Sequence, residues 1–120
     1  MLTEEKQLKK YFDYITKHSR NERFRSFMYK TRTHVVVCLL IGAVNNNDKG
    51  IAYEEICDSI PSKYASRTTI LTILQEGLFL KYLTKEADPM DKRKQLYKLN
   101  KALKSRIISW AKDMNKIFSN

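Results

Sequence analysis

The stretch from residue 66 to residue 100 constrains the fold more than any other part of this chain. Apolar residues at helical spacing predict a helix over 66–80, and strand-forming residues predict strands at 82–87 and 94–99. The polar turn between the strands, residues 88–93, reads Asp-Pro-Met-Asp-Lys-Arg. We expect the buried face of the helix to consist of Ile70, Ile73, Leu74 and Gly77.

The opposite face of this helix carries polar side chains. A period of 3.6 residues places Thr68, Thr72 and Gln75 there, with Arg67 on the flank. Such side chains can hydrogen-bond to base edges or phosphates, and the alternative is a solvated helix face. A short helix is expected at 53–59, so the two helices form a helix-turn-helix. With the basic hairpin that follows, the pattern predicts a winged helix-turn-helix.

The flanking segments are predicted to be mainly helical. Apolar residues at helical spacing follow Thr3, which is available to cap a first helix, and Asn100 is the expected cap of a last helix. The apolar run 35–44 is compatible with strand or helix; we favour a helix capped by Thr33, followed by a loop at 45–50 and a very short strand at 51–52. The chain is thus expected to be one mainly α domain, 1–120, with a small β-hairpin. Residues 51–100 form the helix-turn-helix and wing within it.

The charge balance favours a polyanionic partner. The chain has 23 Lys+Arg against 13 Asp+Glu, a formal net charge of +10. Double-stranded DNA is the partner we expect, with an anionic membrane surface and simple solubility as the alternatives. The longest apolar run is too short to span a bilayer, so a cytoplasmic protein without membrane contact is expected.

No pattern in the sequence predicts catalysis or metal binding. Cys38 and Cys57 form no CxxC motif, and His18 and His34 lie in different segments. Phosphate-binding and hydrolase motifs are missing from the sequence. We therefore expect neither an enzyme nor a metal or other cofactor.

Three motifs resemble those of the MarR-type winged-helix transcription regulators. They are Ser-Arg-Thr-Thr-Ile at 66–70, Leu78 followed by Tyr82-Leu83, and the turn at 88–93. The resemblance implies that the helix at 66–80 reads the major groove, that Arg93 reaches the minor groove, and that the terminal helices pair two subunits. Two features depart from the family pattern: Lys81 stands where glycine is common, and no separate sixth helix follows the last one.

The wing carries the most specific chemistry. Arg93 is either a minor-groove probe or a salt-bridge partner of Asp88 or Asp91. Lys92 and Lys94 flank it in a way that suits phosphate contacts.

An apolar stripe on the first and last helices predicts a homodimer, with dimerisation segments at 1–30 and 101–120. Trp110 is the expected anchor, and completion of a monomer's core is the alternative. The predicted interface residues are Leu8, Tyr11, Phe12, Ile15, Leu103, Ile107, Trp110, Met114 and Phe118.

Together these features predict a transcriptional regulator that binds a pseudo-palindromic operator as a dimer. The alternatives are a plasmid- or phage-type replication-initiator winged helix and a winged-helix protein-interaction module. Whether a small-molecule effector exists is left open by the sequence.

Overall fold

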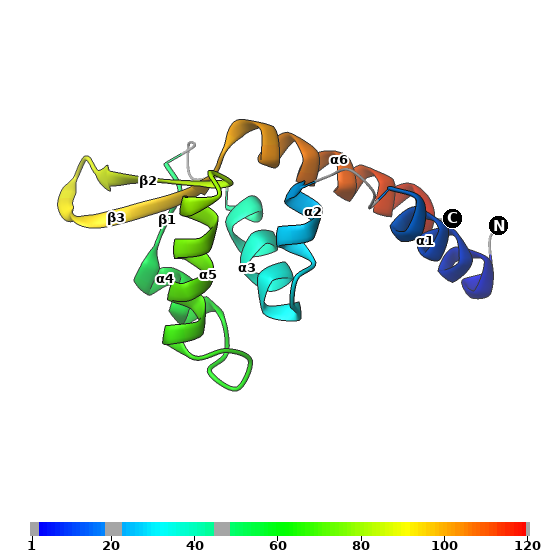
Figure 1. Cartoon of the computed structure of the whole chain (residues 1–120), viewed down its shortest axis with the longest axis horizontal. Helices are drawn as coiled ribbons and strands as arrows, with labels where there is room; N and C mark the ends of the chain where they lie inside the picture. The colour runs from blue at the N-terminus through cyan, green and yellow to red at the C-terminus, as the bar shows by residue number, and fades with distance from the viewer. Residues whose placement is uncertain (1–2, 19–22, 45–48, 120) are drawn as a thin grey trace.

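The computed structural model describes residues 3–18, 23–44 and 49–119 and folds them into helices and a three-stranded antiparallel sheet (Figure 1). Of the loop predicted at 45–50, residues 45–48 lie outside the described part. The mainly helical class and the single small sheet are as predicted. The elements are α1 (Glu4–His18), α2 (Arg23–Met28), α3 (Arg32–Ala43), β1 (Ile51–Ala52), α4 (Tyr53–Ser59), α5 (Arg67–Phe79), β2 (Leu83–Asp88), β3 (Asp91–Leu99) and α6 (Lys101–Phe118).

Helix α3 is the centre of the core. It contacts α2, α4, α5, β3 and α6, which explains why its sequence is apolar around most of its circumference and shows no clear period. The helix predicted over 35–44 is confirmed, but the predicted cap is wrong. Thr31 is the N-cap, since its backbone is extended and its hydroxyl oxygen accepts from the His34 N–H at 3.2 Å. Thr33 lies inside the first turn of the helix.

The helix-turn-helix forms from α4 and α5. Ser66 caps α5 by accepting a hydrogen bond from the Thr69 N–H at 3.1 Å, as expected of a serine before a helix. The predicted buried face is confirmed: the buried residues of α5 are Ile70, Ile73, Leu74 and Gly77.

The C-terminal end of α5 is capped by a lysine, at a position where glycine is common. Lys81 adopts a left-handed backbone conformation with φ of 67°. The Tyr82 N–H donates to the Gly77 carbonyl at 2.9 Å, and the Lys81 N–H donates to the Leu78 carbonyl at 3.1 Å. These two bonds form a Schellman motif. Because lysine has a Cβ, the left-handed conformation at this position is strained, whereas glycine would adopt it without strain.

The sheet has the strand order β1-β3-β2, with β2 and β3 forming a hairpin. The hairpin turn is shorter than predicted: β2 extends to Asp88 and β3 begins at Asp91, so that only residues 89–90 lie between the strands. Ala87 pairs with Gln95 while Asp88 pairs with Asp91. Residues 92–94 therefore have no cross-strand partner in β2 and form a bulge, which is why this segment looks like a turn in the sequence.

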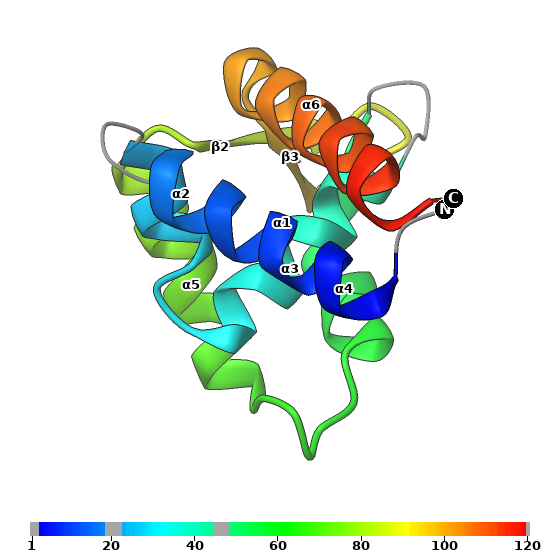
Figure 2. The same ribbon diagram turned by 90° about the vertical axis from the view of Figure 1, so that its right-hand side faces the viewer.

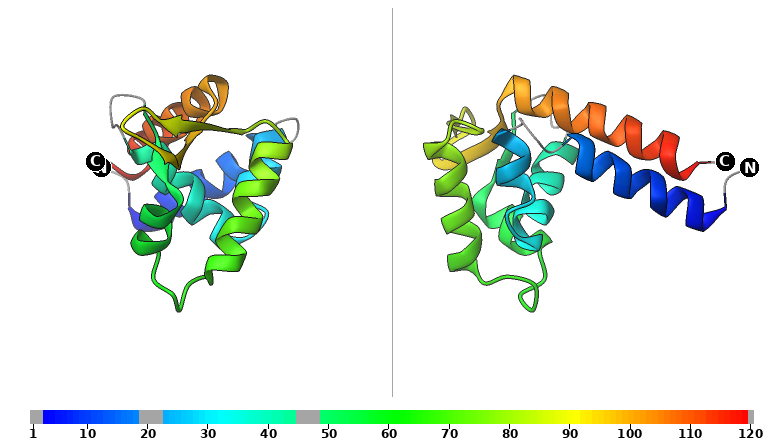
Figure 3. Two further views of the ribbon diagram at one scale, coloured as in Figure 1. Left: turned by 90° about the vertical axis from the view of Figure 1, so that its left-hand side faces the viewer. Right: turned by 45° about the vertical axis from the view of Figure 1, so that its right-hand side comes forward.

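Helices α1 and α6 form an arm that projects from the body of the molecule, on the side away from the hairpin tip (Figure 1). Figure 2 shows the same arm from its end, with α1 and α6 toward the viewer. The Tyr11 and Phe118 rings pack edge to face at 5.7 Å, and the Gln7 side-chain amide donates to the Phe118 carbonyl. The Arg25 guanidinium donates to the Tyr14 hydroxyl at 2.6 Å and so ties α2 to α1. The first turn of α1 and the last turn of α6 lie at the far end of the arm (Figure 3).

Candidate nucleic-acid interface

The structure places the three predicted polar residues of α5 together on its solvent face. Thr68, Thr72 and Gln75 are all exposed. The Thr72 hydroxyl donates to the Thr68 carbonyl at 2.9 Å, so its oxygen lone pairs remain free to accept. The face therefore offers amide donors and hydroxyl acceptors to a ligand in front of the helix.

Arg67 is more constrained than the sequence suggested. Its guanidinium lies 2.9 Å from the Glu54 carboxylate and 3.9 Å from that of Asp58, although the side chain stays 55% exposed. The Tyr53 hydroxyl donates to the Arg67 backbone carbonyl at 3.2 Å. These contacts hold the N-terminus of α5 against α4.

The two wing aspartates organise the hairpin end. The Asp88 carboxylate accepts from the Met90 N–H at 2.9 Å. Asp91 Oδ1 accepts from both the Arg93 backbone N–H at 3.1 Å and its Nε at 3.2 Å. This pairing with Arg93 lowers the pKa of Asp91, so the carboxylate stays ionised. The Arg93 side chain is nevertheless 92% exposed, and it stands in the bulge between Lys92 and Lys94.

A groove of about 440 Å³ separates the wing from the helix-turn-helix. Leu71 of α5 lines it together with Arg93 and Lys94 of the wing, and residues of α4, β1 and the rest of β3 complete the lining. Leu71 is thus at the surface beside the wing, where a ligand in front of α5 would meet it.

A polar brace, which no local sequence pattern indicates, holds one flank of α5, where Thr68, Thr72 and Glu76 line the same hollow. His34 Nε2 lies 2.9 Å from Glu76 Oε1, and Lys30 Nζ lies 2.9 Å from Glu76 Oε2. These contacts, with His34 first, lower the pKa of Glu76. Because an ionised carboxylate only accepts, Nε2 donates to Glu76, and Nδ1 on the other side of the ring lies 2.7 Å from the Thr31 hydroxyl.

Arg32 places a further positive charge near the start of α5. The Arg32 guanidinium lies 5.0 Å from the centre of the Tyr64 ring, in the loop that enters the helix. Cation–π packing holds a guanidinium in place while leaving its N–H groups available. No sequence pattern connects these two residues.

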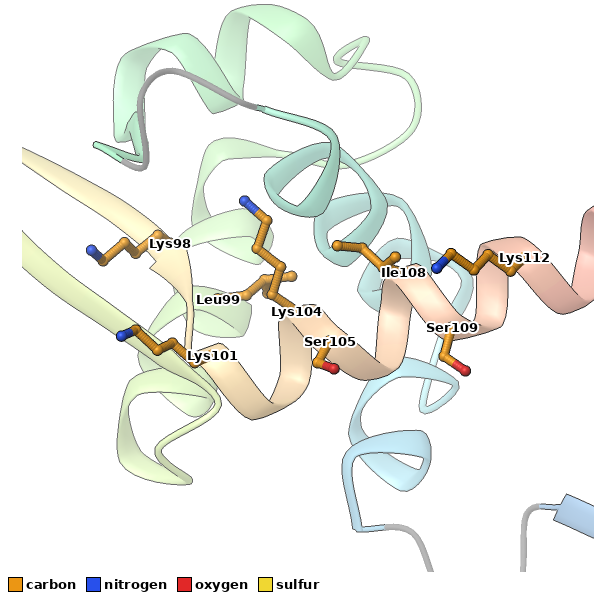
Figure 4. Close-up of a pocket in the computed structure, with 8 residues that line it drawn as sticks. All are labelled: Lys98, Leu99, Lys101, Lys104, Ser105, Ile108, Ser109 and Lys112. Carbon is orange, nitrogen blue, oxygen red and sulfur yellow. The ribbon is translucent and has the colours of Figure 1, made fainter.

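Four lysines surround a hollow of about 520 Å³ at the junction of β3 and α6 (Figure 4). Lys98 comes from β3, and Lys101, Lys104 and Lys112 come from α6. None of the predicted DNA-binding residues lines this hollow, so it provides charge-matched control positions.

The predicted dimer residues fall into three groups. Leu103 and Ile107 are buried in the subunit's own core, because α6 begins against α3 and β3 before it joins the arm. Tyr11, Trp110 and Met114 are half-buried. Exposed apolar surface remains on the arm at Leu8 (63%), Phe12 (57%), Ile15 (37%) and Phe118 (44%).

Within the described residues, no group of three or more His, Cys, Asp or Glu side chains is placed to hold a metal ion. The helices of the same residues include none with the length and apolar character needed to cross a membrane.

Comparison with known proteins identifies the fold. Neither a family model nor a curated protein matches the sequence. Among solved structures, the crystal structure of an S. aureus MepR–DNA complex is similar, with 14% sequence identity and a TM-score of 0.53. The similarity covers 97% of this chain and 82% of that chain. MepR is a MarR-family winged-helix regulator.

The chain has the MarR-type winged-helix fold. At this level of identity the likeness concerns the fold, and it confirms the architecture that the motifs at 66–70 and 88–93 predicted. It extends over nearly the whole chain, so the flanking helices as well as the helix-turn-helix and wing belong to the shared architecture.

Proposed function

We propose that this protein is a sequence-specific, double-stranded DNA-binding transcriptional regulator that acts as a dimer at a pseudo-palindromic operator. One observation carries the proposal: an exposed polar helix face lies beside a hairpin whose bulge holds three consecutive basic residues, 92–94. The net charge of +10 and the likeness to a regulator solved with DNA point the same way.

In the proposed complex, α5 lies in the major groove. Thr68, Thr72 and Gln75 face the base edges, where hydrogen-bonding groups carry sequence information. The brace from His34 and Lys30 to Glu76 keeps α5 in a fixed orientation, so these side chains meet the bases from a rigid support.

The wing then meets the neighbouring minor groove. Arg93, with Asp91 limiting its rotation, enters a groove whose negative potential is strongest where it is narrow. Lys92 and Lys94 contact phosphates and position the wing without reading sequence.

Dimerisation is proposed through the arm. Leu8, Phe12 and Ile15 form an exposed apolar stripe on α1, and an identical stripe on a second copy would cover it by two-fold symmetry. Two recognition helices would then approach neighbouring major grooves about 34 Å apart.

The deciding experiment is a duplex-binding titration over a range of salt concentrations. Arg93→Ala should reduce the binding free energy by about 1–3 kcal/mol, and Lys92→Ala should flatten the salt slope by about one unit. Lys112→Ala removes the same charge from the hollow on α6 and should change affinity far less. Equal losses for Arg93→Ala and Lys112→Ala would contradict a role for the wing.

Reading by α5 requires a separate measurement. Binding-site selection from random duplexes should return a changed motif for Thr68→Ala, Thr72→Ala or Gln75→Ala. An unchanged motif for all three variants would refute the assignment of α5 to the major groove.

The dimer is tested by sedimentation. Phe12→Ser should lower the dimer mass and DNA affinity together, whereas Lys10→Ser, on the opposite face of α1, should change neither. A wild-type monomer at micromolar concentration that binds a palindromic site at full strength would rule out this part of the proposal.

A further inference from the structure

The extreme tip of the wing is apolar. Pro89 and Met90 are the two residues between β2 and β3, and the Met90 side chain is 87% exposed, more than any other large apolar residue in the described part of the chain. Packing within the subunit does not account for a large apolar side chain at this position. The hairpin that carries it projects beyond α4 and α5 (Figure 1).

The tip is also held in a defined shape. Proline fixes its own φ, and the Asp88 carboxylate accepts the Met90 N–H at 2.9 Å. Asp91 holds the Arg93 backbone N–H on the other side of the turn. An exposed side chain on a rigid turn loses less conformational entropy on binding than one on a mobile loop.

Basic residues stand directly behind the apolar tip. The bulge at 92–94 contributes three cations, and the Arg93 side chain is 92% exposed. An apolar tip on a basic hairpin matches the chemistry of proteins that insert an apolar side chain between bases while cations contact the groove and the phosphates.

We propose that Met90, backed by Pro89, inserts as an apolar wedge between two base pairs in the minor groove, where it partly unstacks them and bends the duplex. This inference rests on the proposed DNA-binding function and goes beyond it. Arg93 stays behind the wedge in the groove. Because pyrimidine–purine steps unstack most easily, the wing selects a flexible step such as TA, and Met90 contributes to specificity through DNA deformability.

The test uses the duplex recovered by binding-site selection and compares wild type with Met90→Ser and Met90→Leu. Phe79→Ser is the matched control, since Phe79 is also strongly exposed (84%) but lies at the end of α5 rather than on the wing. Permanganate reactivity detects unstacked thymines at any position, and circularly permuted duplexes report bending in a gel shift.

Wild-type protein should make thymines at two symmetric positions hyper-reactive and should bend the duplex. Met90→Ser should abolish both signals and lower affinity about tenfold, the low end of what burial of a methionine side chain is worth. Met90→Leu and Phe79→Ser should retain both signals. Unchanged thermal unfolding of each variant shows that folding is intact.

Two results would overturn the wedge while leaving DNA binding in place. One is specific binding by wild type without hyper-reactive thymines or bending, and the other is hyper-reactivity that survives Met90→Ser. Failure of the proposed function itself would look different, because wild-type protein would then show no salt-dependent binding to any duplex.

Discussion

The brace on the flank of α5 gives a prediction whose size follows from the structure. Glu76→Ala removes the contacts to His34 and Lys30 at once. The His34 side chain is 7% exposed and that of Glu76 25%, so their hydrogen bond is partly buried and stabilises by about 1.5–3 kcal/mol. The Lys30 side chain is 58% exposed, and its ion pair contributes only about 0.2–1 kcal/mol.

One effect opposes these losses. Glu76 lies in the last turn of α5, where a carboxylate interacts unfavourably with the helix dipole, and its removal returns about 0.3–1 kcal/mol. Alanine is itself an excellent helix former, so the backbone adds no penalty. We therefore expect Glu76→Ala to lower the free energy of unfolding by about 2 kcal/mol, and Lys30→Ala by less than about 1 kcal/mol.

Urea unfolding followed by circular dichroism at neutral pH measures both variants. The pKa of Glu76 is lowered in the folded protein, so the stability it provides is complete above its ordinary value of 4.5. That stability is lost as the pH falls through the lowered value, and the wild-type and Glu76→Ala curves should converge there. If Glu76→Ala were no more destabilising than Lys30→Ala at pH 7, the bond to His34 would contribute no more than the relieved helix-dipole repulsion of about 0.3–1 kcal/mol, and the reasoning would fail.

Three backbone positions give further expectations in the same unfolding assay. Lys81→Gly should raise stability by about 0.5–1 kcal/mol, because glycine adopts the left-handed conformation without strain. Gly77→Ala should lower it by about 1–3 kcal/mol, since a Cβ would lie 2.6 Å from Leu83 Cδ1. Gly50→Ala should lower it by more than about 1 kcal/mol, because φ is +94° and a Cβ would meet the Tyr97 carbonyl oxygen at 2.5 Å. A stabilising Gly50→Ala or a destabilising Lys81→Gly would contradict these backbone assignments.

Local patterns in the sequence determined most of the elements. Helical spacing identified the buried face of α5, and the caps Ser66 and Asn100 were recognisable because capping depends on residues within one turn of each other. The exposed face of α5 followed from the same period. The cap of α3 was placed at Thr33 rather than Thr31 because both threonines precede the apolar run, and only backbone geometry distinguishes them.

The tertiary structure decided what depends on contacts between distant segments. The bond from His34 to Glu76 joins residues 42 positions apart, and no local spacing encodes it. Likewise, the stripe on α6 looked continuous in sequence. In the structure its residues serve two different sites. Leu103 and Ile107 pack in the core with α3 and β3, whereas Phe118 packs against Tyr11 on the arm.

In the wing, some features follow from the local sequence and others only from strand pairing. The sequence determined that residues 88–93 turn back and carry basic charge, because proline and aspartate favour turns and charge is a property of composition. Only the pairing of β2 with β3 decided that the turn is two residues long and that residues 92–94 form a bulge. That register placed Met90, and not Arg93, at the tip, because strand pairing is set by contacts across the sheet and not by the order of residues within either strand.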